Sequence, residues 1–343
     1  MEERSSSADG LQPIPWEPEK VLRSVPSVEA RLSRGFLRCR PERWLPGLST
    51  HWITLAHSLG VEFDVLEVKP FVSIPRGFDQ AFVGTVDDEP IAFALEEEAL
   101  QTLIDVIIPG SPRSAGRVLA EYLARRLLTS LGLSWSGPEL SNIRFDSEMN
   151  ASDLRFAAGI RVTFSVNGSS CVVWISLGKL MIDKLDGLWR RQIHSTGKVE
   201  EEENGQYSLE LTQLAVPPSM LSQYTKKGAV IDLETSLSDD IILSHNGSPW
   251  SKAKLCIVDS VFGFEIVPQP VPQFALPEGT TRLSLSFGEM TFNTKELAEI
   301  SQAGAVCETT LPVSNRVSMR IGGEPVSEGV LCSFEGRFAV SVV

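Results

Sequence analysis

The C-terminal stretch Gly304–Val343 reads GAVCETTLPVSNRVSMRIGGEPVSEGVLCSFEGRFAVSVV. Three runs in it alternate apolar and polar residues with period two, which is typical of strands with one buried face. The residues expected to face inward are Val317, Met319 and Ile321 in the first run, Val330, Cys332 and Phe334 in the second, and Phe338, Val340 and Val342 in the third. Gly322-Gly323-Glu324-Pro325 and Glu335-Gly336 separate the runs and suit tight turns. We therefore predict a small β-meander here.

The same pattern occurs a second time upstream. Gly228-Ala229-Val230 repeats Gly304-Ala305-Val306 at an offset of 76 residues (304 − 228), and the alignment continues without a gap. The matched pairs are Leu221/Leu297, Gly247/Gly323, Pro249/Pro325, Ser251/Ser327, Leu255-Cys256/Leu331-Cys332, Phe262/Phe338 and Val267/Val343. Because Gly, Pro, Cys and Phe rarely coincide by chance in one ungapped alignment, we interpret this as a tandem duplication of one fold unit.

Each repeat is small enough to need a partner. A unit of about 60 residues buries a low fraction of its surface and is marginally stable alone. We therefore predict obligate pairing, either of the first repeat with the second in one chain or of two second repeats between chains. The expected pairing residues are Val317, Met319, Ile321, Phe334, Phe338 and Val340, together with Leu221 and Trp250. An ordinary closed monomer core would use the strand residues equally well, and Trp250 suits either packing under a linker or anchoring a partner.

Upstream of the repeats, the chain predicts an α/β unit with a weaker internal repeat. Two expected hairpins, each followed by a helix, lie roughly 80 residues apart (166 − 86). The first joins 82–86 to 91–95 across Asp87-Asp88-Glu89-Pro90, with a helix over 96–107; the second joins 162–166 to 171–175 across Asn167-Gly168, with a helix through Leu180, Ile182 and Leu185. Further helices are expected from Ser27, from Ser49 to Gly60, and from Ser114 with Leu119, Leu123, Leu127 and Leu131 facing a core.

These patterns predict six segments, which we list in chain order. They are an N-terminal tail and short helix over 1–48, an α/β domain over 49–197, an acidic linker over 198–207, the first repeat over 208–267, a proline-rich linker over 268–279 and the second repeat over 280–343. Residues 1–25 are expected to be loose or docked as extended chain. The acidic linker suits a hinge, a contact for a basic partner or plain solvated chain.

The composition limits the classes of partner. The net charge is −13, which argues against nucleic acid or an anionic membrane as the main partner, since both attract basic surfaces. We expect neither a secretory signal nor a membrane-spanning run, and the five cysteines form no C-x-x-C pair. Reducing cytoplasm is therefore the expected compartment. No nucleotide-binding loop, metal-ligand pattern or serine-nucleophile motif stands out, so we expect no cofactor and no enzymatic activity.

The repeats resemble a known domain family. The G-A-V start, the G-x-P turn and the F-E-G-R-F-A-V-x-V ending look like the SPOA (surface presentation of antigens) domain of flagellar motor switch and type III secretion C-ring proteins. Two such domains in tandem resemble the SctQ family of sorting-platform proteins. The match covers residues 208–343, and the first copy departs from it with Ser260-Val261-Phe262-Gly263. The resemblance implies an α+β protein, with a CheC-like α/β domain before two SPOA domains that pair into an intertwined, saddle-like unit.

The resemblance also implies a function. It suggests a non-enzymatic docking component of the cytoplasmic C-ring or sorting platform, peripheral to the bacterial inner-membrane apparatus. The implied partners are the ATPase-linker (stator) protein, the membrane-ring adaptor, effector–chaperone complexes and, indirectly, the export ATPase. A flagellar motor switch protein is the alternative, although its signalling-protein docking peptide is missing. A CheC-like phosphatase is a further alternative: Glu139 and Asn142 have the required spacing, but Trp135 stands where an acid or serine belongs.

Overall fold

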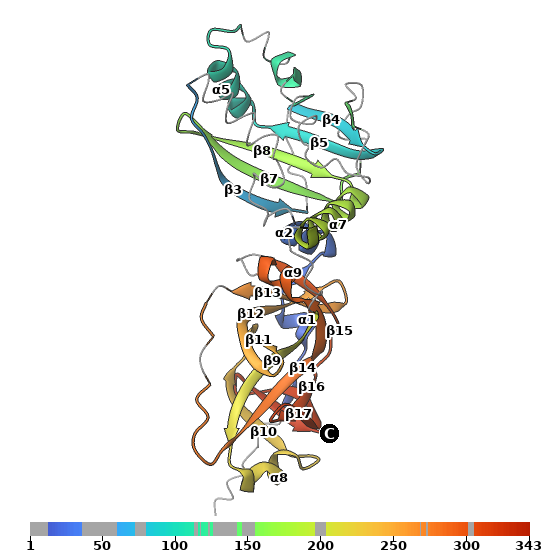
Figure 1. Cartoon of the computed structure of the whole chain (residues 1–343), viewed down its shortest axis with the longest axis vertical. Helices are drawn as coiled ribbons and strands as arrows, with labels where there is room; N and C mark the ends of the chain where they lie inside the picture. The colour runs from blue at the N-terminus through green and yellow to red at the C-terminus, as the bar shows by residue number, and fades with distance from the viewer. Residues whose placement is uncertain are drawn as a thin grey trace, which may run out of the picture. The chain divides into compact units, whose positions relative to one another are not determined.

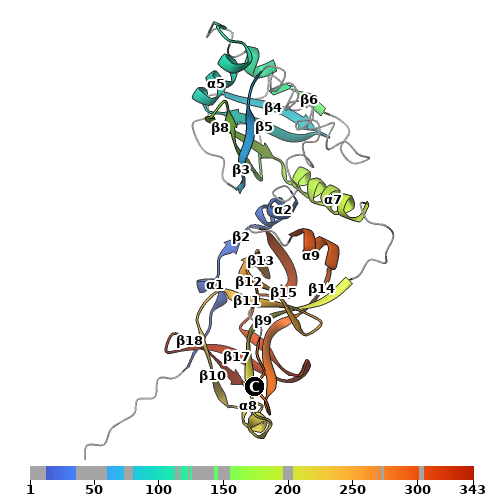
Figure 2. The same cartoon turned by 60° about the vertical axis from the view of Figure 1, so that its left-hand side comes forward.

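The structure, a computed structural model, forms two compact units (Figures 1 and 2). It describes residues 13–35, 60–72, 80–112, 116, 118–122, 124–125, 143–145, 155–195, 204–267, 269–271, 274–300 and 305–343. One unit spans Pro26–Glu200, and the other combines Met1–Val25 with Glu201–Val343. The fold is mixed α/β and mostly β-sheet, which confirms the predicted class in this broad form.

The unit from Pro26 is an antiparallel sheet with helices, the α/β unit. Its elements are α2 (Ser27–Gly35), β3 (Phe63–Phe71), β4 (Gln80–Val86), β5 (Glu89–Leu95), α5 (Glu97–Ile107), β6 (Ile143–Phe145), β7 (Ala158–Val166), β8 (Ser169–Leu177) and α7 (Lys179–Ser195). The strands lie in the order β3-β7-β8-β5-β4-β6. The hairpins β4–β5 and β7–β8 meet through β5 and β8 at the centre, so the predicted repeat of hairpin and helix is confirmed.

Both hairpin turns depend on left-handed backbone. Asp87 and Asp88 have φ of 50° and 67°, and Asn167 and Gly168 have φ of 49° and 81°. Two successive residues at positive φ match the right-handed twist of the flanking strands. Val86 pairs directly with Glu89, so the first turn has two residues rather than the four predicted, and Pro90 belongs to β5.

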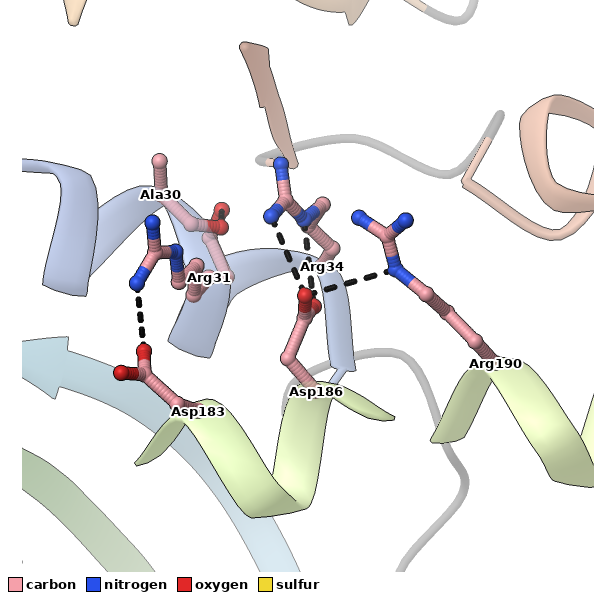
Figure 3. Close-up of polar contacts among 7 residues, drawn as sticks. Ala30, Arg31, Arg34, Asp183, Asp186 and Arg190 are labelled. Atoms are coloured by element: carbon pink, nitrogen blue, oxygen red, sulfur yellow. Dashed lines mark hydrogen bonds and ion pairs between the residues drawn. The ribbon is translucent and has the colours of Figure 1, made fainter. Parts of the chain in front are cut away.

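Helix α2 packs on α7 and belongs to the α/β unit, whereas the sequence prediction placed it outside that domain. Figure 3 shows the polar contacts that join the two helices. Arg34 Nε and Nη2 donate to the two carboxylate oxygens of Asp186, each at 3.2 Å, and Arg31 pairs with Asp183. The Arg34 side chain is 6% exposed and that of Asp186 11%, so the pair is shielded from solvent. The apolar side of α2 buries Leu32 at 2% exposure.

Helices α5 and α7 lie where the sequence predicted helices, and α7 runs through Leu180, Ile182 and Leu185 as expected. It buries Met181 and Ile182 at 0% and 1% exposure, whereas Leu180 is 58% exposed. A helix turns by about 100° per residue, so neighbouring side chains point in different directions. On the other half, Leu119 packs against a cluster that contains Leu100 of α5. The predicted positions Ser49, Leu123, Leu127, Leu131, Trp135, Glu139 and Asn142 lie outside the residues whose side chains are described.

The second unit, here the β unit, consists mainly of ten strands from the two repeats. The first repeat supplies β9 (Asn204–Val216), β10 (Val230–Ser236), β11 (Asp240–His245), β12 (Ser248–Val258) and β13 (Val261–Val267). The second supplies β14 (Thr281–Asn293), β15 (Val306–Pro312), β16 (Arg316–Ile321), β17 (Glu324–Phe334) and β18 (Arg337–Val342). Short elements complete the unit: β1 (Ile14–Pro15), α1 (Pro18–Val21), β2 (Ser24–Val25), η4 (Pro218–Met220), α8 (Leu221–Tyr224) and α9 (Thr294–Ile300). Strand β9 begins inside the segment predicted as an acidic linker, and Tyr207 is already buried at 1% exposure.

Candidate assembly surface on the paired repeats

The two repeats form one sheet around a central strand pair. The strand order is β10-β18-β17-β16-β14-β9-β11-β12-β13-β15, with the long strands β9 and β14 side by side in the middle. Equivalent strands lie at mirrored places in this order, as a twofold pseudo-symmetry requires. Under the 76-residue offset, Leu214 corresponds to Met290 and Tyr207 corresponds to Leu283. The pairs Leu214–Leu283 and Tyr207–Met290 are therefore equivalent. The centre of this symmetry falls on the pair Glu210–Ser286.

Each repeat gives one strand to the other. Strand β10 of the first repeat pairs with β18 of the second, and β15 of the second pairs with β13 of the first. Ile231 stands opposite Val340, and the equivalent residues Cys307 and Phe264 stand opposite each other in the second exchange. Because these strands close the outer edges of the partner repeat, neither repeat has a complete sheet alone.

The predicted pairing residues lie at different depths in this unit. Val317, Met319, Phe338 and Val340 are at most 2% exposed, whereas Ile321 and Phe334 are half-buried. Val340 is the one of these six that stands directly opposite a strand residue of the other repeat in the described register. The pairing role of the set remains a prediction.

The second alternating run differs from the expectation. Leu331 is 0% exposed, whereas Val330 and Phe334, expected to face the core, are half-buried. Cys332 is 5% exposed, as expected. Leu331 and Cys332 are neighbours on β17 and point to opposite faces of the sheet, yet both are buried, so both faces are covered at this end of the strand. A strand covered on both faces does not follow the single-face rule that strict alternation assumes.

Leu221 and Trp250 lie near the surface of the β unit. Leu221 opens α8 and is half-buried. Trp250 is also half-buried and contacts Tyr207 edge-on, with ring centroids 5.7 Å apart. Tyr207 in turn stacks on His245 at 4.6 Å. The indole of Trp250 is therefore held against the first repeat and keeps part of its surface exposed.

The N-terminal segment 13–25 docks on the β unit and links both repeats (Figure 2). Strand β1 pairs with β17 of the second repeat, and β2 pairs in parallel with β12 of the first. The Trp16 backbone N–H donates to the Leu331 carbonyl at 2.9 Å, and the Ile257 N–H donates to the Arg23 carbonyl at 2.9 Å. The sequence left open whether this segment is loose or docked, and the structure shows it docked.

Trp16 is the residue of this segment that enters the core. It is 3% exposed, and its ring lies 5.6 Å from Phe338 and 5.9 Å from Phe287. Phe287 contacts Phe262 at 5.0 Å, and Phe262 is the first-repeat equivalent of Phe338. Four rings therefore form one row that joins the N-terminal segment to both repeats. An isolated tryptophan in a proline-rich stretch was the available sequence signal, and it does not say where the ring will pack.

Three thiols of the β unit are buried. Cys256, Cys307 and Cys332 are free cysteines in the core. Burial raises the pKa of the Cys256 thiol to about 12, and burial also raises the pKa of Cys332. Since the thiolate is the reactive form, the raised pKa disfavours Cys256 and Cys332 as nucleophiles near neutral pH.

Solved structures similar to this chain include two FliM middle domains. The chain is similar to the FliM middle domain from H. pylori, with 15% sequence identity and a TM-score of 0.34, over 47% of this chain and 98% of that one. It is also similar to the FliM middle domain from Vibrio alginolyticus, with 15% identity and a TM-score of 0.32, over 43% of this chain and 95% of that one. No protein-family model matches the chain, and no curated protein matches it. Neither likeness carries a functional conclusion to this chain.

Within the described residues, no helix is both long and apolar enough to cross a lipid bilayer.

Proposed function

We propose that the chain is a non-enzymatic structural and docking component of the cytoplasmic C-ring, or sorting platform, of a type III protein secretion system. The observation that carries this proposal is the exchange of β10 and β15, which joins the two repeats into one body. Such a body presents fixed surfaces from both repeats, as a docking component needs. The SPOA-like motifs of residues 208–343 and their tandem arrangement support the secretion role over that of a flagellar switch protein.

In this proposal the paired repeats bind the ATPase-linker (stator) protein and the α/β unit faces the membrane-ring adaptor. Effector–chaperone complexes are further partners, and the export ATPase is reached through the linker protein. Val230 of β10 and Val326 of β17 are 52% and 42% exposed, so both side chains are available to a partner. Both residues lie near the start of their strands, and exposed apolar side chains suit contact with an apolar partner surface.

The test removes the gene from its own bacterium and measures two outputs. We expect loss of effector secretion with swimming unchanged, and restoration of secretion by the full-length chain. Loss of swimming with secretion intact would instead support the flagellar switch alternative. If neither output changes, the chain has no such role in either machine.

A co-purification experiment tests the proposed partners directly. Tagged full-length chain is expected to retain the ATPase-linker protein and the membrane-ring adaptor from its host. Val230→Asp with Val326→Asp is expected to weaken retention of the linker protein while the chain stays folded, because both side chains point to solvent. In parallel, a phosphorylated response regulator is expected to lose phosphate no faster with the chain than without it. Faster loss would favour a phosphatase.

A further inference from the structure

The centre of the pseudo-symmetry places one residue of each repeat opposite its own equivalent. Glu210 and Ser286 differ by the 76-residue offset of the duplication, and they are also direct partners between β9 and β14. Any pair of repeats that uses this geometry therefore brings together the two residues found at this position. A first repeat contributes a glutamate, and a second repeat contributes a serine.

The position is shielded from water on both strands. Glu210 is 3% exposed and Ser286 1%. Gln213 Nε2 donates to one carboxylate oxygen of Glu210 at 2.6 Å, and Ser208 Oγ donates to the other at 3.3 Å. Ser286 Oγ makes its own hydrogen bonds to the backbone of Gly288 at 3.1 Å. A single carboxylate is thus accommodated by neutral donors from its own strand.

A second carboxylate at the same place would not be accommodated. The register of β9 and β14 is irregular on both sides of the pair Glu210–Ser286, so this pair stands alone at the centre and is not part of a regular ladder. Like charges placed opposite each other on paired strands are destabilising. The penalty grows when both charges are buried without a cation. Two first repeats would bring Glu210 opposite Glu210, whereas a first and a second repeat bring Glu210 opposite Ser286.

The other positions along this pair do not discriminate in the same way. In a pair of two first repeats, Tyr207 would meet Leu214, which is again an apolar contact. Gln213 would meet Ser208, which joins two neutral side chains. The selection therefore rests on position 210.

We propose that Glu210 restricts the first repeat to pairing with a second repeat, either its own or that of another copy of the chain. This rule does not depend on the secretion role, because it concerns only which strands combine. It excludes contact between copies through two first repeats, whereas two second repeats would bring Ser286 opposite Ser286 and are not restricted.

The test places the charges in new combinations in the full-length chain and follows amide hydrogen exchange of β9 and β14 by mass spectrometry. Ser286→Glu is expected to speed exchange in both strands at least about tenfold, since it brings two carboxylates together. Ser286→Gln adds the same bulk without the charge, and its exchange is expected to be much closer to that of the unmodified chain. The exchanged variant Glu210→Ser with Ser286→Glu restores one carboxylate opposite one serine, but Glu289 stands where the first repeat has the donor Gln213. Its protection is therefore expected to recover in part and to exceed that of Ser286→Glu.

Three outcomes would overturn the proposal. One is equal exchange in Ser286→Glu and the unmodified chain. Another is equal loss of protection in Ser286→Gln and Ser286→Glu, which would assign the effect to bulk. The third is no more protection in the exchanged variant than in Ser286→Glu. Light scattering tests whether two copies of the chain associate. Ser286→Glu is expected to form no new dimer, because every pairing of its repeats joins two carboxylates. A new dimer in which β9 is still protected would contradict the proposal.

Discussion

The two units of this protein are both built from internal repeats, but the repeats are joined differently. In the α/β unit each half keeps its own hairpin, and the halves meet along β5 and β8. In the β unit the halves meet along β9 and β14 and also exchange β10 and β15. The α/β unit keeps each hairpin within its own half, although α5 of the first half packs on β8 of the second. Strand exchange in the β unit makes the edge of each repeat depend on the other. We therefore expect the β unit to lose protection as a whole, and the α/β unit to lose it first around the contact that is removed.

The largest expected effect comes from a charge placed in the exchanged strands. Val340→Asp buries an unpaired carboxylate opposite Ile231, which costs more than about 4 kcal/mol. We expect hydrogen exchange to lose protection in both repeats together, while β5 and β8 stay protected. Val230→Asp, in the same strand pair but 52% exposed, is the matched control and is expected to leave exchange nearly unchanged. Loss confined to β18 and β10 would show that the repeats unfold separately.

The next effect tests the dependence of the β unit on residues 13–25. Trp16→Ala removes a buried indole from the row of rings, and such truncations cost about 3–5 kcal/mol. We expect a lower denaturation midpoint for the β unit and faster exchange in β17 and β12. Ile14→Ala, 66% exposed in the same segment, is expected to change the midpoint little. Equal midpoints for Trp16→Ala and the unmodified chain would mean that the segment only rests on the surface.

A smaller and more local effect is expected in the α/β unit. Arg34→Ala removes the bidentate partner of Asp186, which keeps its ion pair with Arg190 Nε at 3.4 Å (Figure 3). We expect a cost of about 1.5–3 kcal/mol, the range for hydrogen bonds to charged groups. Exchange should rise in α2 and α7 while α5 keeps its protection. Arg125→Ala breaks the exposed pair with Glu121 and is expected to cost less than about 0.5 kcal/mol. Equal loss in α5 and α7 would show instead that the α/β unit loses protection as one body.

The smallest effect is a pH dependence carried by Cys256. Its pKa of about 12 in the folded chain lies above the ordinary thiol value, so between pH 9 and 12 the folded state holds a proton that the unfolded state has lost. The β unit therefore loses stability as the pH rises through this range, by at most about 1.4 kcal/mol per pH unit for this group. Cys256→Ala should flatten the decline between pH 9 and 10.5 relative to the unmodified chain. Parallel declines in the two proteins would rule out this contribution.

Much of the fold could be predicted because it rests on local chemistry. Asn167-Gly168 adopts the left-handed backbone that its hairpin requires, and the flanking strands follow from period-two alternation. The 76-residue offset aligns the strands of the two repeats, and Val317 and Met319 are buried as the alternation indicated. The alternation rule assumes that only one face of a strand is buried. It failed in β17, where Leu331 is fully buried and Val330, expected to face the core, is half-buried.

The sequence by itself determined the repeats, their turns and most of their strands, because each depends on residues within a few positions of one another. The tertiary structure alone decided that β10 and β15 change places, that Glu210 faces Ser286, and that Trp16 packs beside Phe338. These contacts join segments far apart in the chain, so they depend on which sheet edges are open and on the entropy of closing long loops. A local pattern shows which face of a strand is apolar, but the partner of its edge is settled only when the whole sheet assembles.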